Sequence, residues 1–170
     1  MKSKLITIIT VLATVLTISS CSSMKKKTSE ATDSAPDALD ANNNGMSLEL
    51  NGDSDSNKAG ALKTVYFDFN SASISNDTKD ALMNNAEFMK SNASVKVQVE
   101  GHCDERGGVQ FNLALGEKRA KSVRDFLMGQ GVEGSRISTI SYGKEKPVSF
   151  GHDEESWAQN RRANFVVTAK

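Results

Sequence analysis

A change of hydrophobic period near residue 105 constrains the fold most strongly. Val95, Val97 and Val99 alternate with polar residues, which is the pattern of a strand with one buried face. From Val109 to Gly129 the apolar and small residues instead recur at helical spacing. The polar stretch 100–108, which ends in two adjacent glycines, joins the two patterns. A strand, a polar loop and a helix in this order often present functional side chains from a rigid scaffold.

The same reasoning predicts the remaining elements. Strands are predicted at 62–69, 95–100, 136–142 and 161–168. A helix is predicted from Asn76 or Asp77, either of which suits an N-cap, to about Lys90, with Asn85 as a polar intrusion on its apolar face. A short helical turn is predicted at 155–159. The order β-α-β-α-β-(α)-β predicts an α+β sandwich, in which a mixed sheet carries its helices mainly on one face.

The first 20 residues have the composition of an export signal. Two lysines precede an apolar run at 5–18, which is shorter than the roughly 20 residues needed to cross a bilayer. Small residues then lead to Cys21, in a pattern that resembles the cleavage site of bacterial lipoproteins. This resemblance implies that 1–20 is a signal peptide and that Cys21 becomes a lipid-modified N-terminus. The alternative is an ordinary signal peptide that leaves Cys21 as a free thiol.

The segment 21–60 is predicted to be a lipidated N-terminus followed by a flexible linker. It is rich in Ser, Asn, Asp, Gly and Ala, so it cannot bury enough apolar area to offset its ordering entropy. Met46, Leu48 and Leu50 alternate with polar residues, which leaves a short strand or a partner-binding segment as alternatives. The folded domain is therefore predicted at 61–170.

Charge and cysteine content exclude some functions. The chain has 21 Lys and Arg against 21 Asp and Glu, so no net field attracts it to nucleic acid, and no nucleic-acid partner is predicted. Cys103 is the only cysteine besides Cys21, so a lipidated Cys21 leaves no internal disulfide.

The polar stretch and the helix that follows it hold a candidate binding site. Asn112 and Arg119 are seven residues apart and lie on one side of the predicted helix, and Asp104 lies in the loop before it. A carboxylate, an amide, a guanidinium and the donor-rich start of a helix suit a zwitterionic, amino-acid-like ligand. In that arrangement Asp104 binds the ammonium and Arg119 grips the carboxylate with two hydrogen bonds. Alternatively, Asp104 pairs with Arg119 or caps the loop.

Catalysis and metal binding are not predicted. We find no activated nucleophile, carboxylate pair or metal triad of the kind that a wall hydrolase or a metal-dependent amidase needs. His102, Cys103 and Asp104 are consecutive residues of a strand, so their side chains point alternately to opposite faces. The sequence therefore predicts a binding module with no cofactor and no metal, in which His102 and Cys103 have packing roles.

Several long motifs resemble one family and occur in its order. They read VYFDFN, EGHCDERGG, FNLALGEKRAKSV and ISYGKEKPVSFGHDEESWAQNRRANFVV, and together they extend over about 64–168. They resemble the peptidoglycan-associated lipoproteins of Gram-negative bacteria, whose domain belongs to the OmpA C-terminal-like group. The resemblance implies an OmpA-like fold that binds, without a covalent bond, the diaminopimelate of peptidoglycan stem peptides.

The resemblance also assigns binding residues to this sequence. It implies that Asp104 and Arg119 hold the diaminopimelate, with further contacts from Phe69, Asn70, Asn112 and Arg161, although Arg161 could instead only support the site from outside. The family usually has Asp where this chain has Asn70, which puts in doubt one supporting contact to the ligand's ammonium.

The family further implies a cellular role. The chain is expected at the outer membrane, held by its lipid, with its domain facing the periplasm. It is expected to act in the Tol-Pal system, with TolB and other components as partners, in outer-membrane constriction at cell division and in envelope integrity. The alternative is an OmpA-like wall-anchoring lipoprotein outside that system.

Overall fold

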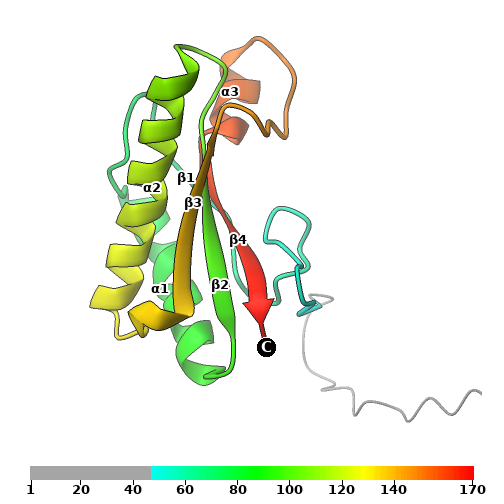
Figure 1. Ribbon diagram of the computed structural model, residues 1–170, viewed down its shortest axis with the longest axis vertical. Helices are drawn as coiled ribbons and strands as arrows, with labels where there is room; N and C mark the ends of the chain where they lie inside the picture. The colour runs from blue at the N-terminus through cyan, green and yellow to red at the C-terminus, as the bar shows by residue number, and fades with distance from the viewer. Residues whose placement is uncertain (1–46) are drawn as a thin grey trace, which may run out of the picture. The chain divides into compact units, whose positions relative to one another are not determined.

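The computed structural model describes residues 47–170, and a four-stranded mixed sheet lies at its centre (Figure 1). The strands are β1 (Val65–Tyr66), β2 (Lys96–His102), β3 (Ile137–Gly143) and β4 (Arg162–Ala169). They lie in the order β1-β4-β2-β3, with β2 and β3 parallel and the other two pairs antiparallel. The predicted mixed sheet is thus confirmed. The predicted signal peptide, Cys21 and the first part of the predicted linker lie outside the described residues.

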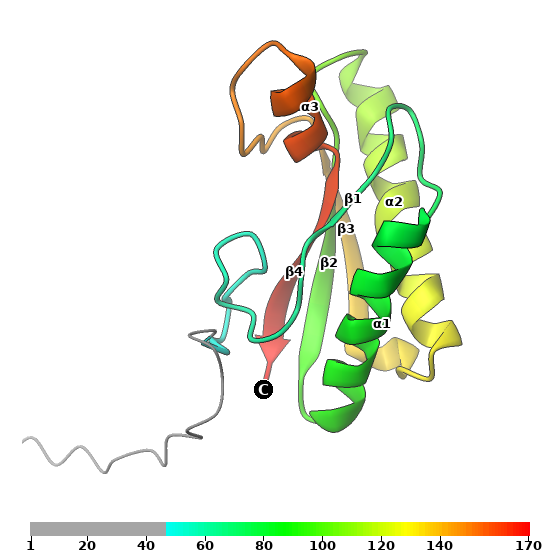
Figure 2. The ribbon, with the colours of Figure 1, turned by 180° about the vertical axis from the view of Figure 1, so that it is seen from behind.

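Two long helices cover one face of the sheet, as predicted (Figure 2). The long helices are α1 (Asn76–Ser91) and α2 (Val109–Gly129). The shorter ones are the 3-10 helix η1 (Gly134–Arg136) and α3 (Glu154–Asn160). The N-cap of α1 is Ser75, whose Oγ accepts a hydrogen bond from the amide of Thr78, so the expectation of Asn76 or Asp77 is wrong by one or two residues. Within residues 47–170, no helix has the length and hydropathy of a membrane span.

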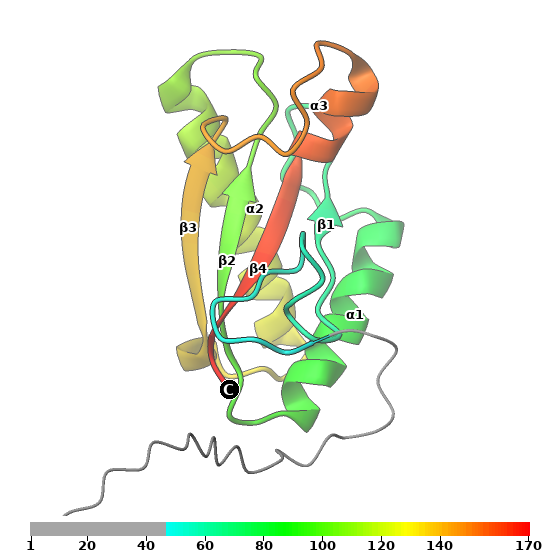
Figure 3. The same cartoon turned by 90° about the vertical axis from the view of Figure 1, so that its right-hand side faces the viewer.

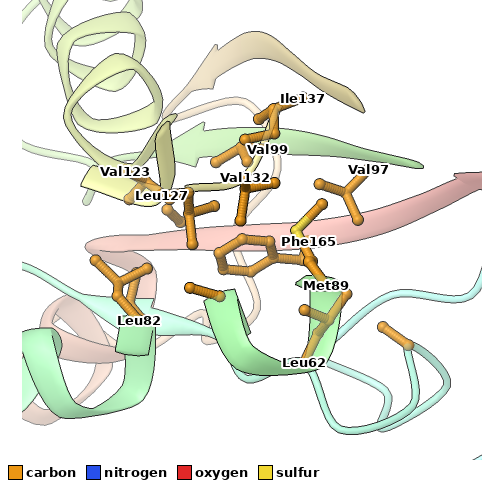
Figure 4. Close-up of a cluster of buried hydrophobic side chains, with 14 of the residues drawn as sticks. Leu62, Leu82, Met89, Val97, Val99, Val123, Leu127, Val132, Ile137 and Phe165 are labelled. Carbon is orange, nitrogen blue, oxygen red and sulfur yellow. The ribbon is translucent and has the colours of Figure 1, made fainter. Parts of the chain in front are cut away.

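The hydrophobic core fills the space between the sheet and these two helices (Figure 4). Its fully buried side chains come from both layers, and they include Leu82, Met89, Val97, Val99, Val123, Leu127, Phe165 and Val167. Burying one such side chain stabilises the fold by roughly 1.5 to 3 kcal/mol. The core thereby holds α2 against β2, the two elements that border the polar stretch.

The first strand is shorter than the predicted 62–69, because only Val65 and Tyr66 pair as a strand with β4. Asn85 on α1 explains part of the difference. Its side chain is fully buried, accepts a hydrogen bond from the Lys63 amide and donates one to the Lys63 carbonyl oxygen, both at 2.8 Å. Asn85 therefore provides hydrogen-bond partners for the backbone amide and carbonyl of Lys63, which lies outside the sheet.

The folded region begins before residue 61, so the linker predicted up to residue 60 ends too late. Asn51 donates to the Val167 carbonyl oxygen at 2.8 Å, and Ser54 donates to that of Phe165 at 2.9 Å. Leu48 forms an isolated bridge with Ala59, which is fully buried. Residues 51–54, within the segment drawn cyan in Figure 3, therefore pair with the part of β4 that the short β1 does not reach.

Candidate functional site

The candidate site forms where β2 ends and α2 begins, and a close approach of these elements brings its residues together. Gly101 on β2 faces Gly116 on α2, and a Cβ atom at Gly101 would overlap the Gly116 carbonyl oxygen. Only a residue without a side chain lets the helix lie this near the strand. The first half of α2 consequently lies beside Cys103 and Asp104, the residues that follow β2.

A cavity of about 170 Å³ opens at this junction. It is lined by Phe69, Asn70, Cys103, Asp104, Arg106, Gly107, Phe111, Asn112, Leu115 and Arg119. Five of the six residues that the sequence predicts for the site are in this lining. The sixth, Arg161, instead supports the lining from behind, because its Nε donates to the Phe67 carbonyl oxygen at 3.0 Å and its Nη1 lies 3.4 Å from Oδ2 of Asp104.

Asp104 is buried and is already bound by two arginines. Its Oδ1 accepts the backbone amide of Arg106 at 3.1 Å and the Nε of Arg106 at 3.2 Å. Its Oδ2 accepts Arg106 Nη2 at 2.7 Å and Arg161 Nη1 at 3.4 Å. Burial works to raise the pKa of Asp104, but the hydrogen bonds from Arg106 outweigh it and hold the pKa below its usual range. Asp104 therefore stays ionised and caps its own loop, and it forms no pair with Arg119.

Arg119 is fully buried, and its guanidinium faces backbone carbonyls. Nε donates to Ser71 at 2.8 Å, Nη2 to Asp68 at 3.0 Å, and Nη1 to His102 at 2.8 Å and to the Cys103 sulfur at 3.4 Å. Four of its five N–H groups are thus used within the protein. The predicted two-bond grip of Arg119 on a ligand carboxylate is not available while these bonds hold, because one N–H group is left.

Asn112 and Asn70 also belong to the polar part of the lining. Asn112 is buried, and its Nδ2 donates to the Arg106 carbonyl oxygen at 2.8 Å, which ties α2 to the loop. Asn70 has a positive φ of 52°, a left-handed conformation that Asn adopts more readily than most residues. The first turn of α2 carries no side-chain cap, so its backbone N–H groups add positive character at this end of the helix.

Arg106 is a site residue that the sequence reasoning missed. Its guanidinium lies over two aromatic rings, 3.9 Å from the centroid of Phe69 and 4.1 Å from that of Trp157. Its Nη1 also lies 3.6 Å from Oε2 of Glu154. The available signal was its position in the loop, two residues after Asp104 and directly before Gly107 and Gly108.

The remaining polar residues near the site have structural roles. Trp157 donates from Nε1 to Glu105 at 2.9 Å, so it holds the last loop in place. His102 is buried and stacks on Tyr142 with 5.6 Å between ring centroids, and Cys103 is a buried free thiol. Across residues 47–170, no three metal-ligating side chains gather in one place.

The sequence of this chain matches a known protein family and several relatives. A profile of the OmpA family matches residues 66–161. The peptidoglycan-associated lipoprotein of Pseudomonas aeruginosa is 46% identical over 105 residues, which are 62% of this chain and 62% of the relative. That of Haemophilus influenzae is 40% identical over 124 residues, or 73% of this chain and 81% of the relative.

Solved structures agree with these relatives. The crystal structure of the peptidoglycan-associated lipoprotein from Burkholderia pseudomallei matches with a TM-score of 0.60 and 47% identity. The match covers 61% of this chain and 88% of that structure. The matched segment thus spans most of that solved chain, but only about three fifths of the full Pseudomonas relative.

Proposed function

Because this chain belongs to the OmpA family, among the peptidoglycan-associated lipoproteins, we propose that it binds peptidoglycan non-covalently through the cavity between β2 and α2. The observation that carries the proposal is the ionised, buried Asp104 in the wall of that cavity. A buried carboxylate favours a cationic ligand group strongly, because little water competes for it.

The ligand that fits the cavity is the zwitterionic end of diaminopimelate in a stem peptide. A cavity of about 170 Å³ is smaller than the roughly 300 to 1,000 Å³ of pockets that enclose a whole small molecule, so it suits one side chain of a polymer. Asp104 offers the negative pole for the ammonium. The buried charge of Arg119 and the uncapped start of α2 make the other side favourable for a carboxylate.

We further propose that Cys21 carries a lipid that holds this domain at the outer membrane, facing the periplasm. The relatives from Pseudomonas and Haemophilus are named lipoproteins, which supports this assignment. The proposed setting is the Tol-Pal system, with TolB as a partner, in outer-membrane constriction and envelope integrity. A wall-anchoring lipoprotein outside that system is the alternative, and co-purification of TolB with the full chain distinguishes the two.

Pull-down with purified sacculi tests the wall-binding proposal. Asp104→Asn keeps the shape of the side chain and removes its charge, so we expect binding to fall about tenfold or more, since hydrogen bonds to charged groups contribute about 1.5 to 3 kcal/mol. Asp125→Asn is the matched control, because Asp125 is exposed on α2 away from the cavity lining. Unchanged binding by Asp104→Asn would remove Asp104 from the site, and absence of binding by the parent would refute the function.

A further inference from the structure

In the unliganded protein the carboxylate that should receive an ammonium is already taken. Arg106 donates three hydrogen bonds to Asp104, from its amide, Nε and Nη2, and Arg161 adds a longer contact. Two carboxylate oxygens offer about four acceptor positions, so these donors occupy them all. A ligand ammonium therefore reaches Asp104 only by displacing a donor, and the Arg106 guanidinium, the more exposed of the two arginine side chains, is the one free to move.

Arg106 is placed to bind a ligand carboxylate once it leaves Asp104. Its side chain is 29% exposed and lines the cavity, whereas that of Arg119 is fully buried. Besides Asp104, the one salt-bridge partner of its guanidinium within residues 47–170 is the exposed carboxylate of Glu154, 3.6 Å from Nη1, and Glu154 already accepts a hydrogen bond from Arg161 Nη2 at 2.7 Å. Three of its five N–H groups have no hydrogen-bond partner within residues 47–170, and they include the Nη1–Nη2 edge that binds carboxylates with two bonds.

Two aromatic rings keep the guanidinium near the cavity. Phe69 and Trp157 each contact it at about 4 Å from their centroids, and Phe69 is itself part of the lining. Cation–π contacts are tolerant of rotation in the ring plane, so they restrain the position of the charge and not its hydrogen-bonding direction. Arg106 can thus turn from one carboxylate to another without leaving the rings.

We propose that Arg106 selects the ligand by exchanging ion pairs. On binding, the guanidinium leaves Asp104 for the ligand's carboxylate, and the ligand's ammonium takes the positions that Arg106 vacates on Asp104. The exchange conserves charge on both sides, so each charged group keeps a partner. This inference rests on the proposed function and names the residue that recognises the second charge of the ligand.

The exchange distinguishes a zwitterion from a simple amine. An amine such as a lysine side chain displaces Arg106 from Asp104 but brings no carboxylate, so Arg106 is left with Glu154, which is mostly exposed and binds weakly. A diaminopimelate side chain replaces both halves of the broken pair. Arg106 thus favours diaminopimelate over lysine at the same position of a stem peptide.

The test uses two soluble muropeptides that differ only in having meso-diaminopimelate or L-lysine at the third position. Calorimetry with the parent protein is expected to give a preference for the diaminopimelate peptide of about ten- to a hundredfold, the range of one charge-assisted carboxylate contact. Arg106→Gln removes the charge, and we expect it to bind the two peptides within about threefold of each other, since the hydrogen-bonded contact to the second carboxylate is then lost and only the field of Arg119 and of the start of α2 still favours it.

A spectroscopic signal follows the same step. Trp157 is the only tryptophan of the chain and lies over the Arg106 guanidinium. Movement of Arg106 should change its emission when the diaminopimelate peptide binds to the parent, and this change should be absent in Arg106→Gln. Lys118→Gln, on the exposed side of α2, is the charge-matched control and should retain both the preference and the emission change.

The outcomes separate the two proposals. If the parent binds neither peptide, the proposed function fails and this inference with it. If the parent prefers diaminopimelate and a folded Arg106→Gln keeps that preference, the ion-pair exchange is wrong while the wall binding stands. Arg106→Lys keeps the charge without the planar edge, so it provides a second folded variant, and full retention of the preference there would refute the two-bond contact.

Discussion

The sequence positions of two arginines near the cavity indicate that Arg119 contacts a ligand and that Arg106 does not. In the structure Arg119 is bonded to backbone carbonyls, and Arg106 contacts the binding carboxylate. Arg119 lies in a helix at a spacing that suits a ligand, yet its guanidinium holds the carbonyl groups of two loop residues and of His102 at the end of β2. Arg106 lies in a glycine-containing loop, yet it contacts the Asp104 carboxylate and the ring of Phe69, both in the lining. The difference arises because a long side chain can reach several acceptors, and the buried ones bind it most strongly.

Replacement of Arg119 should therefore destabilise the whole domain. For Arg119→Met we expect the free energy of unfolding to fall by about 2 kcal/mol or more, since the buried His102 carbonyl left without a donor costs about 1 to 3 kcal/mol and the part-buried contacts to Ser71 and Asp68 are lost as well. Urea denaturation measures the change. Lys118→Met, at the exposed neighbouring position, should change stability by no more than about 0.5 kcal/mol. Equal midpoints for Arg119→Met and the parent would show that the carbonyl contacts contribute nothing.

Among the secondary-structure elements, the contact of β2 with α2 decides whether a site exists. The core packs the two together, and the glycine pair at positions 101 and 116 lets them approach closely. This approach places the start of α2 beside Asp104, so the geometry of the cavity depends on two residues that carry no functional group. The short β1 and residues 51–54 affect a different edge of the sheet.

Adding one methyl group at this contact should separate the elements. Gly101→Ala places a Cβ against the Gly116 carbonyl oxygen, and we expect it to cost about 1 to 3 kcal/mol in stability, as overpacking does. Sacculus binding by the folded fraction should weaken as well, because α2 and Asp104 move apart.

A second glycine supplies the control for this experiment. Gly129, the last residue of α2, has no atom within 4 Å of an added Cβ. Gly129→Ala should leave sacculus binding unchanged and raise stability by up to about 1 kcal/mol, because Ala favours helix more than Gly. A Gly101→Ala protein as stable as the parent would contradict the close-packing account.

For the molecule as a whole, the proposed role requires two attachments. The lipid on Cys21 attaches the chain to the membrane, and the cavity attaches it to the wall. The described domain includes residues 47–60, so the segment that connects Cys21 to the domain is shorter than the predicted linker. Neither attachment depends on the other in this account, so each can be removed separately.

Substitution of Cys21 tests the anchor alone. Cys21→Ser should move the full chain from the outer-membrane fraction to the soluble periplasmic fraction, because no acyl chain can be attached, while sacculus binding persists. Cys103→Ser is the control, since Cys103 is buried within the domain, and this variant should remain in the membrane fraction. A Cys21→Ser protein that stays with the membrane would show that another feature anchors it.

Hydrophobic period and motif order were sufficient to predict the element order, the mixed sheet and the family, and five of the six site residues that they indicated lie in the cavity lining. They were sufficient because burial repeats every two residues in a strand and every 3.6 in a helix, and because Asp104 and Asn112 are close along the chain. Only the tertiary structure showed that residues 51–54 pair with β4, that Asn85 satisfies Lys63, and that Arg106 rather than Arg119 contacts Asp104. These contacts depend on which backbone groups and charges remain without partners after the elements pack, and no local pattern of residues records that.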